Sequence, residues 1–439
     1  MTDNSQYLKA AYFTLGCKLN FAETSTIGKM LAERGITRAA KGETPDICVV
    51  NTCSVTEMAD KKGRRLIRSL HTRYPGAAIA VTGCYAQLKP DEVANLPGVD
   101  IVLGSGEKLR MAQYIDSWLT DRKKHVEVTP FLDIREFQPS CERGDRTRYF
   151  LKVQDGCDYF CTYCTIPYAR GRSRSGDTDR LVEMAREAAA NGGKEIVITG
   201  VNIGEFGKDN GQSLFELLRR LDDVEGIRRY RISSIEPNLL TEEIIRWTAT
   251  EARAFMPHFH IPLQSGSDRV LKLMNRRYDT ALFRSRIETV RELIPDAFIG
   301  VDIIAGARGE TPEEWERSLE FAESLDVTRY HVFPYSERPG TKALLLGDVV
   351  SQEEKHRRVG LLTALSDRKM EAFMKKAEDS VRPVLWEQPS GDDRMHGLTD
   401  NYIRVEAPLR PALINEISMA RIGKIHPTEP EIVIGMHES

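Results

Sequence analysis

The chain has 439 residues and a formal net charge of −3; 41% of its residues are hydrophobic and 29% charged, as in a soluble globular protein of two or three domains. It has no apolar run near the roughly 20 residues that cross a bilayer, and Met1–Ala10 is polar, so we expect neither a membrane-spanning nor a secreted protein. The expected compartment is the cytoplasm. Eight cysteines are too few for a disulfide framework, and the overall charge gives no evidence of a nucleic-acid partner.

Residues 9–118 alternate short apolar runs with helix-like stretches. Strands are predicted at Ala10–Leu15, Ile47–Val50, Ala78–Val81 and Val99–Leu103, and helices at Phe21–Arg34, at Thr56–Tyr74 and after Pro90. Strands that alternate with helices predict a parallel sheet with helices on its faces, as in flavodoxin-like and Rossmann-like domains.

Three cysteines follow the first three of these strands. Cys17, Cys53 and Cys84 each lie just beyond a strand's carboxyl end, whereas Cys48 lies inside a strand and reads as a core residue. Ligands of an open α/β sheet bind at the carboxyl edge, so the three thiols are predicted to converge on one crevice. Burial as small hydrophobic side chains is the alternative.

A polar connection over residues 121–147 leads into a second series of strand and helix units. Its strands are predicted at Phe150–Val153, Glu195–Thr199, Arg229–Ile232, His258–Pro262, Ala297–Ile304 and Arg329–Phe333. Glycines at the helix ends and Ser, Thr or Asp at the helix starts support these boundaries. Six units fall short of the eight that close a TIM barrel.

The loop after the first of these strands contains Cys157, Cys161 and Cys164, in the spacing C-x3-C-x2-C. Zinc in a structural site takes four ligands, usually as two pairs. Three closely spaced thiolates instead suit a cubane iron–sulfur cluster that leaves one iron without a protein ligand. Such an open iron can chelate the amino and carboxylate groups of a small molecule.

The tail begins with a helix over about Gln352–Glu378 and continues with short β-prone runs, which predict a small OB-like β-barrel. The predicted domains are residues 1–120, a linker over 121–147, a barrel over 148–350, a connecting helix over 351–379 and a tail domain over 380–439. Residues 380–439 hold more acidic than basic residues, so RNA contact there needs a local patch such as Arg394, Arg404 and Arg421.

The cysteine loop, including Tyr163 just before the third cysteine, resembles the radical S-adenosylmethionine (SAM) superfamily. That resemblance implies a partial (β/α)6 barrel with a [4Fe–4S] cluster at its mouth, where SAM is cleaved to a 5′-deoxyadenosyl radical. Residues at the strand ends are then the expected SAM contacts. They are Tyr163, Gly200, Asn202, Ser234, Glu236, Gln264 and Arg277, with Arg276 as the alternative to Arg277.

Three sequence segments resemble the cluster motifs of the methylthiotransferases, which are radical SAM enzymes with two [4Fe–4S] clusters. The segments are Thr14–Asn20, Asn51–Thr56 and Thr82–Cys84. Among the branches, Cys17-Lys18-Leu19-Asn20 is closest to the Cys-Lys-Val-Asn of the tRNA threonylcarbamoyladenosine branch. The isopentenyladenosine branch typically has Cys-Gln-Met-Asn there, and the ribosomal protein S12 branch has Cys-Pro-Lys-Asn. Residues 396–405 resemble a TRAM domain, an RNA-binding module.

The resemblance implies methylthiolation of C2 of N6-threonylcarbamoyladenosine at tRNA position 37, with two [4Fe–4S] clusters and SAM as cofactors. The expected partners are the tRNA anticodon stem-loop and an electron donor such as flavodoxin or ferredoxin, and a monomer is expected. Methylthiolation of ribosomal protein S12 or of isopentenyladenosine tRNA is one alternative. A non-catalytic iron–sulfur or zinc RNA-binding protein is another.

Two basic zones are candidate RNA contacts, although solvated surface charge is the alternative for both. The first is the helix after Cys53, with Lys61, Lys62, Arg64, Arg65, Arg68 and Arg73. The second surrounds the cysteine loop and comprises Arg143, Arg146, Arg148, Lys152, Arg170, Arg172, Arg174 and Arg180. His258 and His260 are expected to be structural rather than metal ligands.

Overall fold

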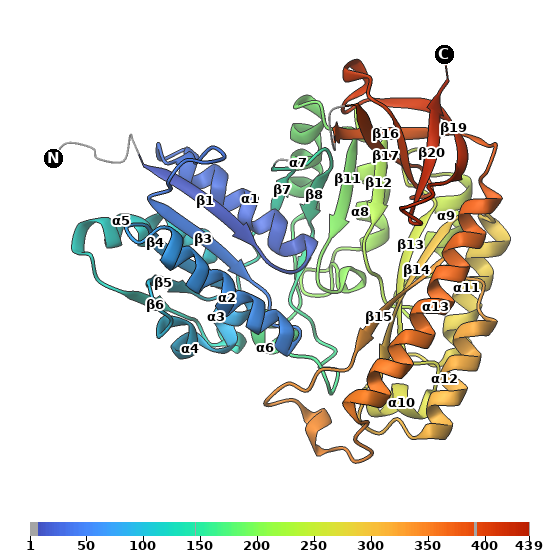
Figure 1. Ribbon diagram of the computed structural model, residues 1–439, viewed down its shortest axis with the longest axis horizontal. Coiled ribbons are helices and arrows are strands. Elements are labelled where there is room, and N and C mark those ends of the chain that lie inside the picture. The colour runs from blue at the N-terminus through green and yellow to red at the C-terminus, as the bar shows by residue number, and fades with distance from the viewer. Residues whose placement is uncertain (1–7, 145, 390–392, 439) are drawn as a thin grey trace.

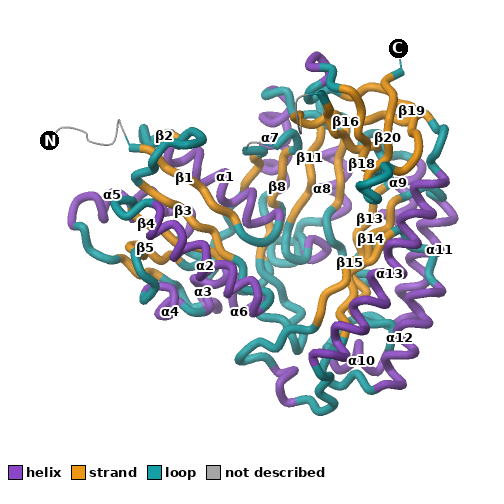
Figure 2. The backbone as a smooth tube through the Cα atoms, in the orientation of Figure 1, coloured by secondary structure: helices purple, strands orange, loops and turns teal. Residues whose placement is uncertain are grey.

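A computed structural model describes residues 8–144, 146–389 and 393–438, which form an N-terminal parallel sheet, a barrel-like wall of parallel strands and a small closed barrel (Figure 1). Figure 2 shows the strands of the barrel between the N-terminal domain on one side and helices α11, α12 and α13 on the other. Within the described ranges no helix is both long and apolar enough to cross a membrane.

The N-terminal sheet has six parallel strands in the order β2-β1-β3-β4-β5-β6. They are β1 (Lys9–Thr14), β2 (Thr37–Arg38), β3 (Ile47–Thr52), β4 (Ala78–Gly83), β5 (Val99–Leu103) and β6 (His125–Glu127), and the helices are α1 (Lys18–Ala32), α2 (Glu57–Arg73), α3 (Cys84–Leu88), α4 (Pro90–Ala94) and α5 (Met111–Asp121). β3 and β4 are buried along their whole length because helices cover both faces. The predicted parallel sheet is confirmed.

Two edge strands and α5 were not predicted. β2 is only two residues long and exposed, and β6 is three residues long, so neither carries an apolar run that marks a strand. The predicted linker contributes β6 to this sheet, and it also contributes β7 (Ser140–Glu142), which pairs antiparallel with the first barrel strand.

The barrel wall consists of six parallel strands, in agreement with the predicted partial (β/α)6 barrel. They are β8 (Tyr149–Lys152), β11 (Glu195–Thr199), β12 (Arg229–Ile232), β13 (His258–Gln264), β14 (Phe298–Ala305) and β15 (Arg329–Pro334). β8, β11 and β12 form one sheet, β13, β14 and β15 another, and isolated bridges such as Ser234 to His260 join the two. The wall therefore ends at β15 on one side and at β7 and β8 on the other.

The outer helices of the barrel are α7 (Thr178–Ala190), α8 (Leu214–Asp222), α9 (Glu242–Thr250), α10 (Asp268–Leu273), α11 (Thr280–Leu293) and α12 (Pro312–Ser324). Six begin at an N-cap side chain that accepts a backbone hydrogen bond, as the Ser, Thr and Asp signals predicted. The short elements β9 (Gln154–Asp155), α6 (Ile166–Arg170) and β10 (Arg174–Ser175) surround the cysteine loop.

The tail consists of α13 (Gln352–Lys376) and a closed barrel in the order β16-β17-β18-β20-β19. Its strands are β16 (Val381–Pro389), β17 (Arg394–Thr399), β18 (Arg404–Pro408), β19 (Ile417–Ile425) and β20 (Ile432–His437). The predicted small β-barrel is confirmed, although β17 and β19 were missed because polar residues and glycines interrupt them.

Two buried arginines of β12 hold the tail barrel against the wall. Arg229 donates to the carbonyl oxygens of Leu398 (2.9 Å) and Pro383 (2.7 Å). Arg231 donates to the carbonyl oxygens of Asp400 (2.7 Å) and Thr399 (2.8 Å), and its Nε donates to Glu195 (2.9 Å). Both side chains are at most 2% exposed, so these bonds form without competition from water.

A buried ion cluster joins the N-terminal domain to the barrel. Glu23 of α1 accepts hydrogen bonds from Lys108 (2.7 Å), Lys152 of β8 (2.9 Å) and Arg170 of α6 (3.0 Å). Asp155 pairs with the same Lys152 (2.7 Å) and Arg170 (2.9 Å) from the barrel side. All five side chains are at most 3% exposed, so each charge depends on the others for compensation.

A second buried contact joins the N-terminal domain to the other end of the wall. Arg338, in the segment after β15, donates to Ser54 Oγ (2.7 Å) and to the Asp60 carboxylate (2.8 Å). The N-terminal domain is thus attached both at β8 and beyond β15, and it covers the open side of the barrel.

Replacing Glu23 tests the ion cluster. Burial alone would raise the pKa of Glu23, but the charges of Arg170, Lys108 and Lys152 outweigh it and hold the pKa well below the ordinary 4.5. Glu23→Gln should lower the free energy of unfolding at pH 7, measured by urea titration, by about 3 kcal/mol. Glu33→Gln, at the exposed C-cap residue of α1, is the matched control.

The pH dependence follows from the direction of the shift. A carboxylate with a depressed pKa stabilises the folded state fully above the unfolded pKa, and this contribution falls as the pH falls toward the folded pKa. The difference in the free energy of unfolding between wild type and Glu23→Gln should therefore shrink below pH 4.5 by about 1.4 kcal/mol per pH unit. A gap that stays constant down to pH 3.5 would contradict this role for Glu23.

Replacing Arg231 tests how the tail is docked. Arg231→Met removes a donor from the carbonyl oxygens of Asp400 and Thr399, of which the second still accepts from the Tyr402 amide (3.2 Å), and it weakens the compensation of Glu195. The docked tail should lose about 3 kcal/mol of stability, seen as faster proteolytic release of the tail barrel. Arg228→Met, which removes an exposed arginine next to β12, should leave the cleavage rate unchanged. Equal rates for the two variants would show that the tail is held elsewhere.

Candidate active site between two cysteine groups

The first cysteine group lies at the carboxyl edge of the N-terminal sheet. Cys17 precedes α1, Cys53 directly follows β3, and Cys84 is the first residue of α3, directly after β4. Gly16 has a φ of +105°, and a Cβ at this position would lie 2.7 Å from the Cys53 Cβ. Glycine is therefore required here, because the loop of Cys17 passes directly against the Cys53 side chain.

Asn20 ties the first two cysteine loops together. Its Nδ2 donates to the carbonyl oxygens of Leu15 (2.8 Å) and Thr52 (3.0 Å), while its Oδ1 accepts from Arg170 of the barrel (2.6 Å). The sequence marked Asn20 only as part of a motif and did not indicate this positioning role.

The thiols of the first group are close enough to influence one another. Burial raises the pKa of Cys53 to about 12, and the neighbouring Cys84 and Cys17 add to the shift. Burial also raises the pKa of Cys84, while the nearby Arg170 guanidinium opposes it. Cys17 is exposed and the other two are at most 8% exposed. Cys48 is fully buried inside β3, where a core residue was expected.

The second group lies in the loop between β9 and α6, beyond the carboxyl end of β8. Each of its sulfurs faces a nitrogen donor. Cys157 Sγ lies 3.5 Å from the Tyr159 amide nitrogen, Cys164 Sγ 3.4 Å from that of Ile166, and Cys161 Sγ 3.3 Å from Arg276 Nη1. Gly156 starts the loop with a φ of +72°, and a Cβ there would lie 2.0 Å from the Arg172 carbonyl oxygen.

The chemistry of both groups fits iron–sulfur clusters. All six cysteines are free, and each group presents three sulfurs. Burial raises the pKa of Cys157, Cys161 and Cys164, so these thiols ionise when a metal cation compensates their charge. The N–H and guanidinium donors suit thiolate sulfur, which accepts hydrogen bonds.

Three of the expected SAM contacts lie beside the second group. Asn202 is buried, its Nδ2 lies 3.9 Å from Cys157 Sγ, and its Oδ1 has no hydrogen-bond partner among the described residues. A ligand amine would satisfy that oxygen. Gly200 packs on Gln154, and a Cβ there would lie 3.0 Å from the Gln154 oxygens. Tyr163 packs instead against a hydrophobic cluster that includes Met274 and Tyr335.

Gln154 is a positioning residue that sequence reasoning missed. Its Oε1 accepts from the amides of Val201 (3.0 Å) and Asn202 (2.9 Å), and its Nε2 donates to the Gly156 carbonyl oxygen (2.8 Å). It therefore fixes the loop after β11 against the start of the cysteine loop. An isolated glutamine in a strand gives no signal of this role.

The remaining expected contacts divide between the interior and the surface. Glu236 forms a buried ion pair with Arg276, which also reaches Cys161. Ser234 and Gln264 lie at the ends of neighbouring strands, half-buried. Arg277 is exposed, donates to the Asp158 carbonyl oxygen (2.8 Å) and lies over the Tyr159 ring. Of the two arginines considered, Arg276 is the one beside the cysteine group.

The loops that carry the two cysteine groups lie against one another. Thr165, which follows Cys164, lies with its Oγ1 3.4 Å from the carbonyl oxygen of Ser54, which follows Cys53. Arg170, at the end of the helix after the second group, reaches Asn20 and Glu23 of the first domain. The loops that carry the two groups therefore meet at one interface.

Several cations of the second predicted basic zone form buried ion pairs instead of an RNA-binding surface. Lys152, Arg170 and Arg174 are buried and paired with Glu23 or Asp155, so the expectation of RNA contact is wrong for them. Arg148 is largely buried and pairs with Glu387 (3.3 Å). Arg146, Arg172 and Arg180 remain exposed.

His258 is buried as expected, but its Nδ1 has no partner among the described residues. His260 and His331 lie with Asp302 on the inner side of β13, β15 and β14, and the ligand atoms of the three are within 4.8 Å of one another. The Asp302 carboxylate lies 2.7 Å from His260 Nε2.

Comparison with protein families agrees with this architecture. The radical SAM superfamily model matches residues 151–322, and the model of the uncharacterized protein family UPF0004 matches residues 9–104. Among solved structures, the chain is similar to the radical S-adenosylmethionine methyltransferase TsrM from Kitasatospora setae, with a TM-score of 0.54, 16% identity and 76% of each chain covered. This similarity shows the fold alone.

The similarity to several enzymes is much higher. The chain is 38% identical to the threonylcarbamoyladenosine tRNA methylthiotransferase of Bacillus subtilis (strain 168), over 94% of this chain and 93% of that one. The Thermotoga maritima enzyme of the same name is 39% identical over 90% of each chain. The tRNA-2-methylthio-N(6)-dimethylallyladenosine synthase of Clostridium tetani is 33% identical over 89% of each chain. Together with the two opposed cysteine groups, these similarities show that the chain belongs to the methylthiotransferase family of radical SAM enzymes.

Proposed function

We propose that this enzyme inserts a methylthio group at C2 of N6-threonylcarbamoyladenosine at position 37 of tRNA, beside the anticodon. The observation that carries the proposal is the contact between the two cysteine loops, Thr165 against Ser54, because sulfur insertion needs both centres at one chamber. The names of the relatives from Bacillus subtilis and Thermotoga maritima support this tRNA substrate.

Family membership makes the chain a transferase that uses [4Fe–4S] clusters and SAM. We assign one cluster to Cys157, Cys161 and Cys164 and the other to Cys17, Cys53 and Cys84. When bound, the first cluster supplies the electron that generates a carbon radical from SAM. The residues proposed to contact SAM are Tyr163, Gly200, Asn202, Ser234, Glu236 and Gln264, with Arg276 in the place first given to Arg277.

The protein's own part is to hold these groups in place. Arg276 is fixed by Glu236 and by the Tyr278 hydroxyl (3.1 Å from its Nε), so its guanidinium stays against Cys161. Gln154 fixes the backbone that carries Asn202, whose Oδ1 has no partner among the described residues and would accept a hydrogen bond from a ligand. These contacts set the geometry before any ligand arrives.

RNA contact is proposed at the mouth of the interface. The exposed cations of α2 lie on a helix that begins there, because the Glu57 amide at the start of α2 donates to Ser336, in the segment after β15 (3.1 Å). The α2 cations are Lys61, Lys62, Arg65, Arg68 and Arg73. A single-stranded anticodon loop presents unstacked bases, and the modified adenine would leave its stack to enter the site. The TRAM barrel offers Arg394, Arg404 and Arg421.

The boundaries 1–120, 121–147, 148–350, 351–379 and 380–439 remain the proposed domains, with β6 and β7 of the segment 121–147 joining the sheets on either side of it. A flavodoxin or ferredoxin as electron donor, a monomeric state and a cytoplasmic location complete the proposal. The competing candidates are the isopentenyladenosine and ribosomal protein substrates. The isopentenyladenosine candidate is supported by the similarity to the Clostridium tetani enzyme, which is named for dimethylallyladenosine.

Cysteine variants separate the two centres. The anaerobically prepared wild type should hold about eight irons per chain, and Cys17→Ala and Cys157→Ala about four each. Only Cys157→Ala should lose reductive cleavage of SAM, measured as 5′-deoxyadenosine, whereas both should lose methylthio transfer. Cys48→Ala, which alters a cysteine inside β3, should keep the iron and the activity. Zinc in place of iron in the wild type would contradict the assignment and favour a structural metalloprotein.

Nucleoside analysis tests the substrate. A strain lacking this chain should lose 2-methylthio-N6-threonylcarbamoyladenosine from its tRNA and accumulate the unmethylthiolated nucleoside, as measured by mass spectrometry. Complementation with wild type should restore the product, and Cys17→Ala should not. Loss of the isopentenyladenosine product instead, or no change in any tRNA nucleoside, would contradict the proposed substrate.

A further inference from the structure

A cavity of about 800 Å³ lies where the N-terminal domain, the barrel wall and the tail barrel meet. Five of its fourteen lining residues are Lys or Arg and two are Glu. The cations are Lys18, Arg146, Arg148, Arg329 and Arg404, and the acids are Glu387 and Glu431. His258, His260 and His331 lie on the inner side of the wall. The cavity therefore suits an anion.

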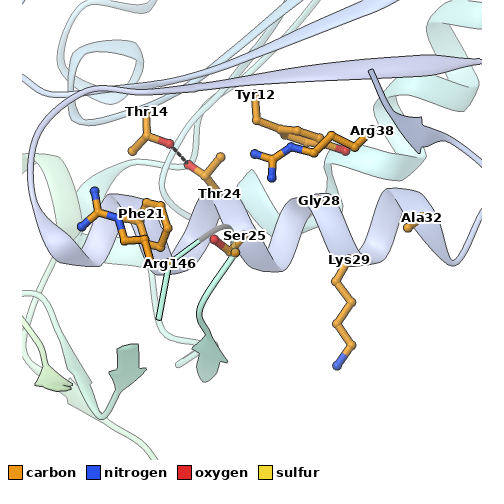
Figure 3. A pocket seen from close by; sticks show the side chains of 11 residues that line it. Tyr12, Thr14, Phe21, Thr24, Ser25, Gly28, Lys29, Ala32, Arg38 and Arg146 are labelled. Atoms are coloured by element: carbon orange, nitrogen blue, oxygen red, sulfur yellow. Dashed lines mark hydrogen bonds between the residues drawn. The ribbon is translucent and has the colours of Figure 1, made fainter. Parts of the chain in front are cut away.

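Most of these cations already have partners. Arg148 pairs with Glu387 (3.3 Å), Arg329 pairs with Glu431, and Arg404 contacts His396. Arg146, which also borders a neighbouring cavity, lies over the Phe21 ring at 4.1 Å (Figure 3). Lys18 differs from the paired cations, because no hydrogen bond or ion pair reaches its Nζ from the part of the chain that the structure describes.

The position of Lys18 links this cavity to the reaction site. Lys18 is the first residue of α1 and directly follows Cys17, so it lies at the first cysteine group. On the wall, His260 lies in the cavity, and β13 continues from it to Gln264, roughly 13 Å further along the strand. Burial raises the pKa of Glu236, and Asp302 beside His260 adds to this shift. Glu236 pairs with Arg276, which reaches Cys161, so these residues lie between the cavity and the second cysteine group.

A metal ion does not suit the His260, Asp302 and His331 group. Burial lowers the pKa of His331 to about 4, and the neighbouring cations Arg329 and Lys18 act in the same direction. The same positive charges would repel a divalent cation at these ligands. The neutral His331 imidazole beside the Lys18 ammonium instead suits an organic anion that also carries hydrogen-bonding groups.

We propose that Lys18 binds the carboxylate of the amino-acid substituent on the substrate adenine, inside this cavity. The inference rests on the proposed function, because threonylcarbamoyladenosine carries one carboxylate at the end of its N6 substituent. The base then lies toward the carboxyl ends of the strands and the substituent points to Lys18. A dimethylallyl substituent has no charge and leaves the ammonium unpaired, so Lys18 selects between the two modified adenosines.

The test is anaerobic binding of anticodon stem-loop RNAs to the enzyme with its clusters, followed by fluorescence anisotropy. The three RNAs carry threonylcarbamoyladenosine, its carboxylate methyl ester or unmodified adenosine. Wild type should bind the acid roughly ten- to hundredfold more tightly than the ester, as expected for one charge-assisted hydrogen bond. Lys18→Met should lose this preference and Lys18→Arg should keep it. Lys29→Met, which removes a more exposed lysine from the same helix, should also keep it.

Two results would overturn the inference. Equal binding of acid and ester by wild type would show that the carboxylate is not recognised, whatever the variants do. A uniform loss of affinity for all three RNAs in Lys18→Met would place a backbone phosphate on Lys18 instead. Either result leaves the proposed function standing if wild type still methylthiolates the acid RNA, whereas failure of that reaction would count against the proposed function itself.

Discussion

The arrangement of this enzyme depends on the buried carboxylate of Glu23. Three buried cations from two domains converge on it, and two of them, Lys152 and Arg170, are shared with Asp155. Burying so many charges costs free energy that their attraction only partly returns, so the cluster is better understood as a device for alignment than for stability. Only one docking of α1 against β8 and α6 satisfies all the charges, and this docking brings Cys84 toward Arg170 and the Ser54 loop against Thr165.

The same logic explains why the centre is divided between two folds. A parallel sheet gathers its loops at one edge, and an open barrel does the same, so two such edges placed opposite one another enclose a chamber. The N-terminal domain is anchored at β8 through Lys152 and beyond β15 through Arg338. It thus closes the side on which the six-stranded wall is incomplete.

The sequence predicted the features that come from local pattern. Alternating strands and helices located Cys17, Cys53 and Cys84 at strand ends, and the strand bounds were correct to within a few residues. It failed where a residue's role depends on a distant partner. Lys152, Arg170 and Arg174 read as an RNA surface because nothing nearby shows that Glu23 and Asp155 neutralise them. Arg276 and Arg277 are equivalent in sequence, and only the turn before α11 decides which one faces inward. The cavity around Lys18 was not predictable, because its lining comes from three separate parts of the chain.

The way in which the tail barrel is attached has a consequence for how its surface can change. Arg229 and Arg231 grip main-chain oxygens of residues 383 and 398–400, which every amino acid possesses. The attachment therefore depends little on which amino acids occupy the positions whose carbonyl oxygens accept these hydrogen bonds. Mutations can accumulate over the outward face of this module and adapt it to different partners, while its attachment to the barrel wall stays the same.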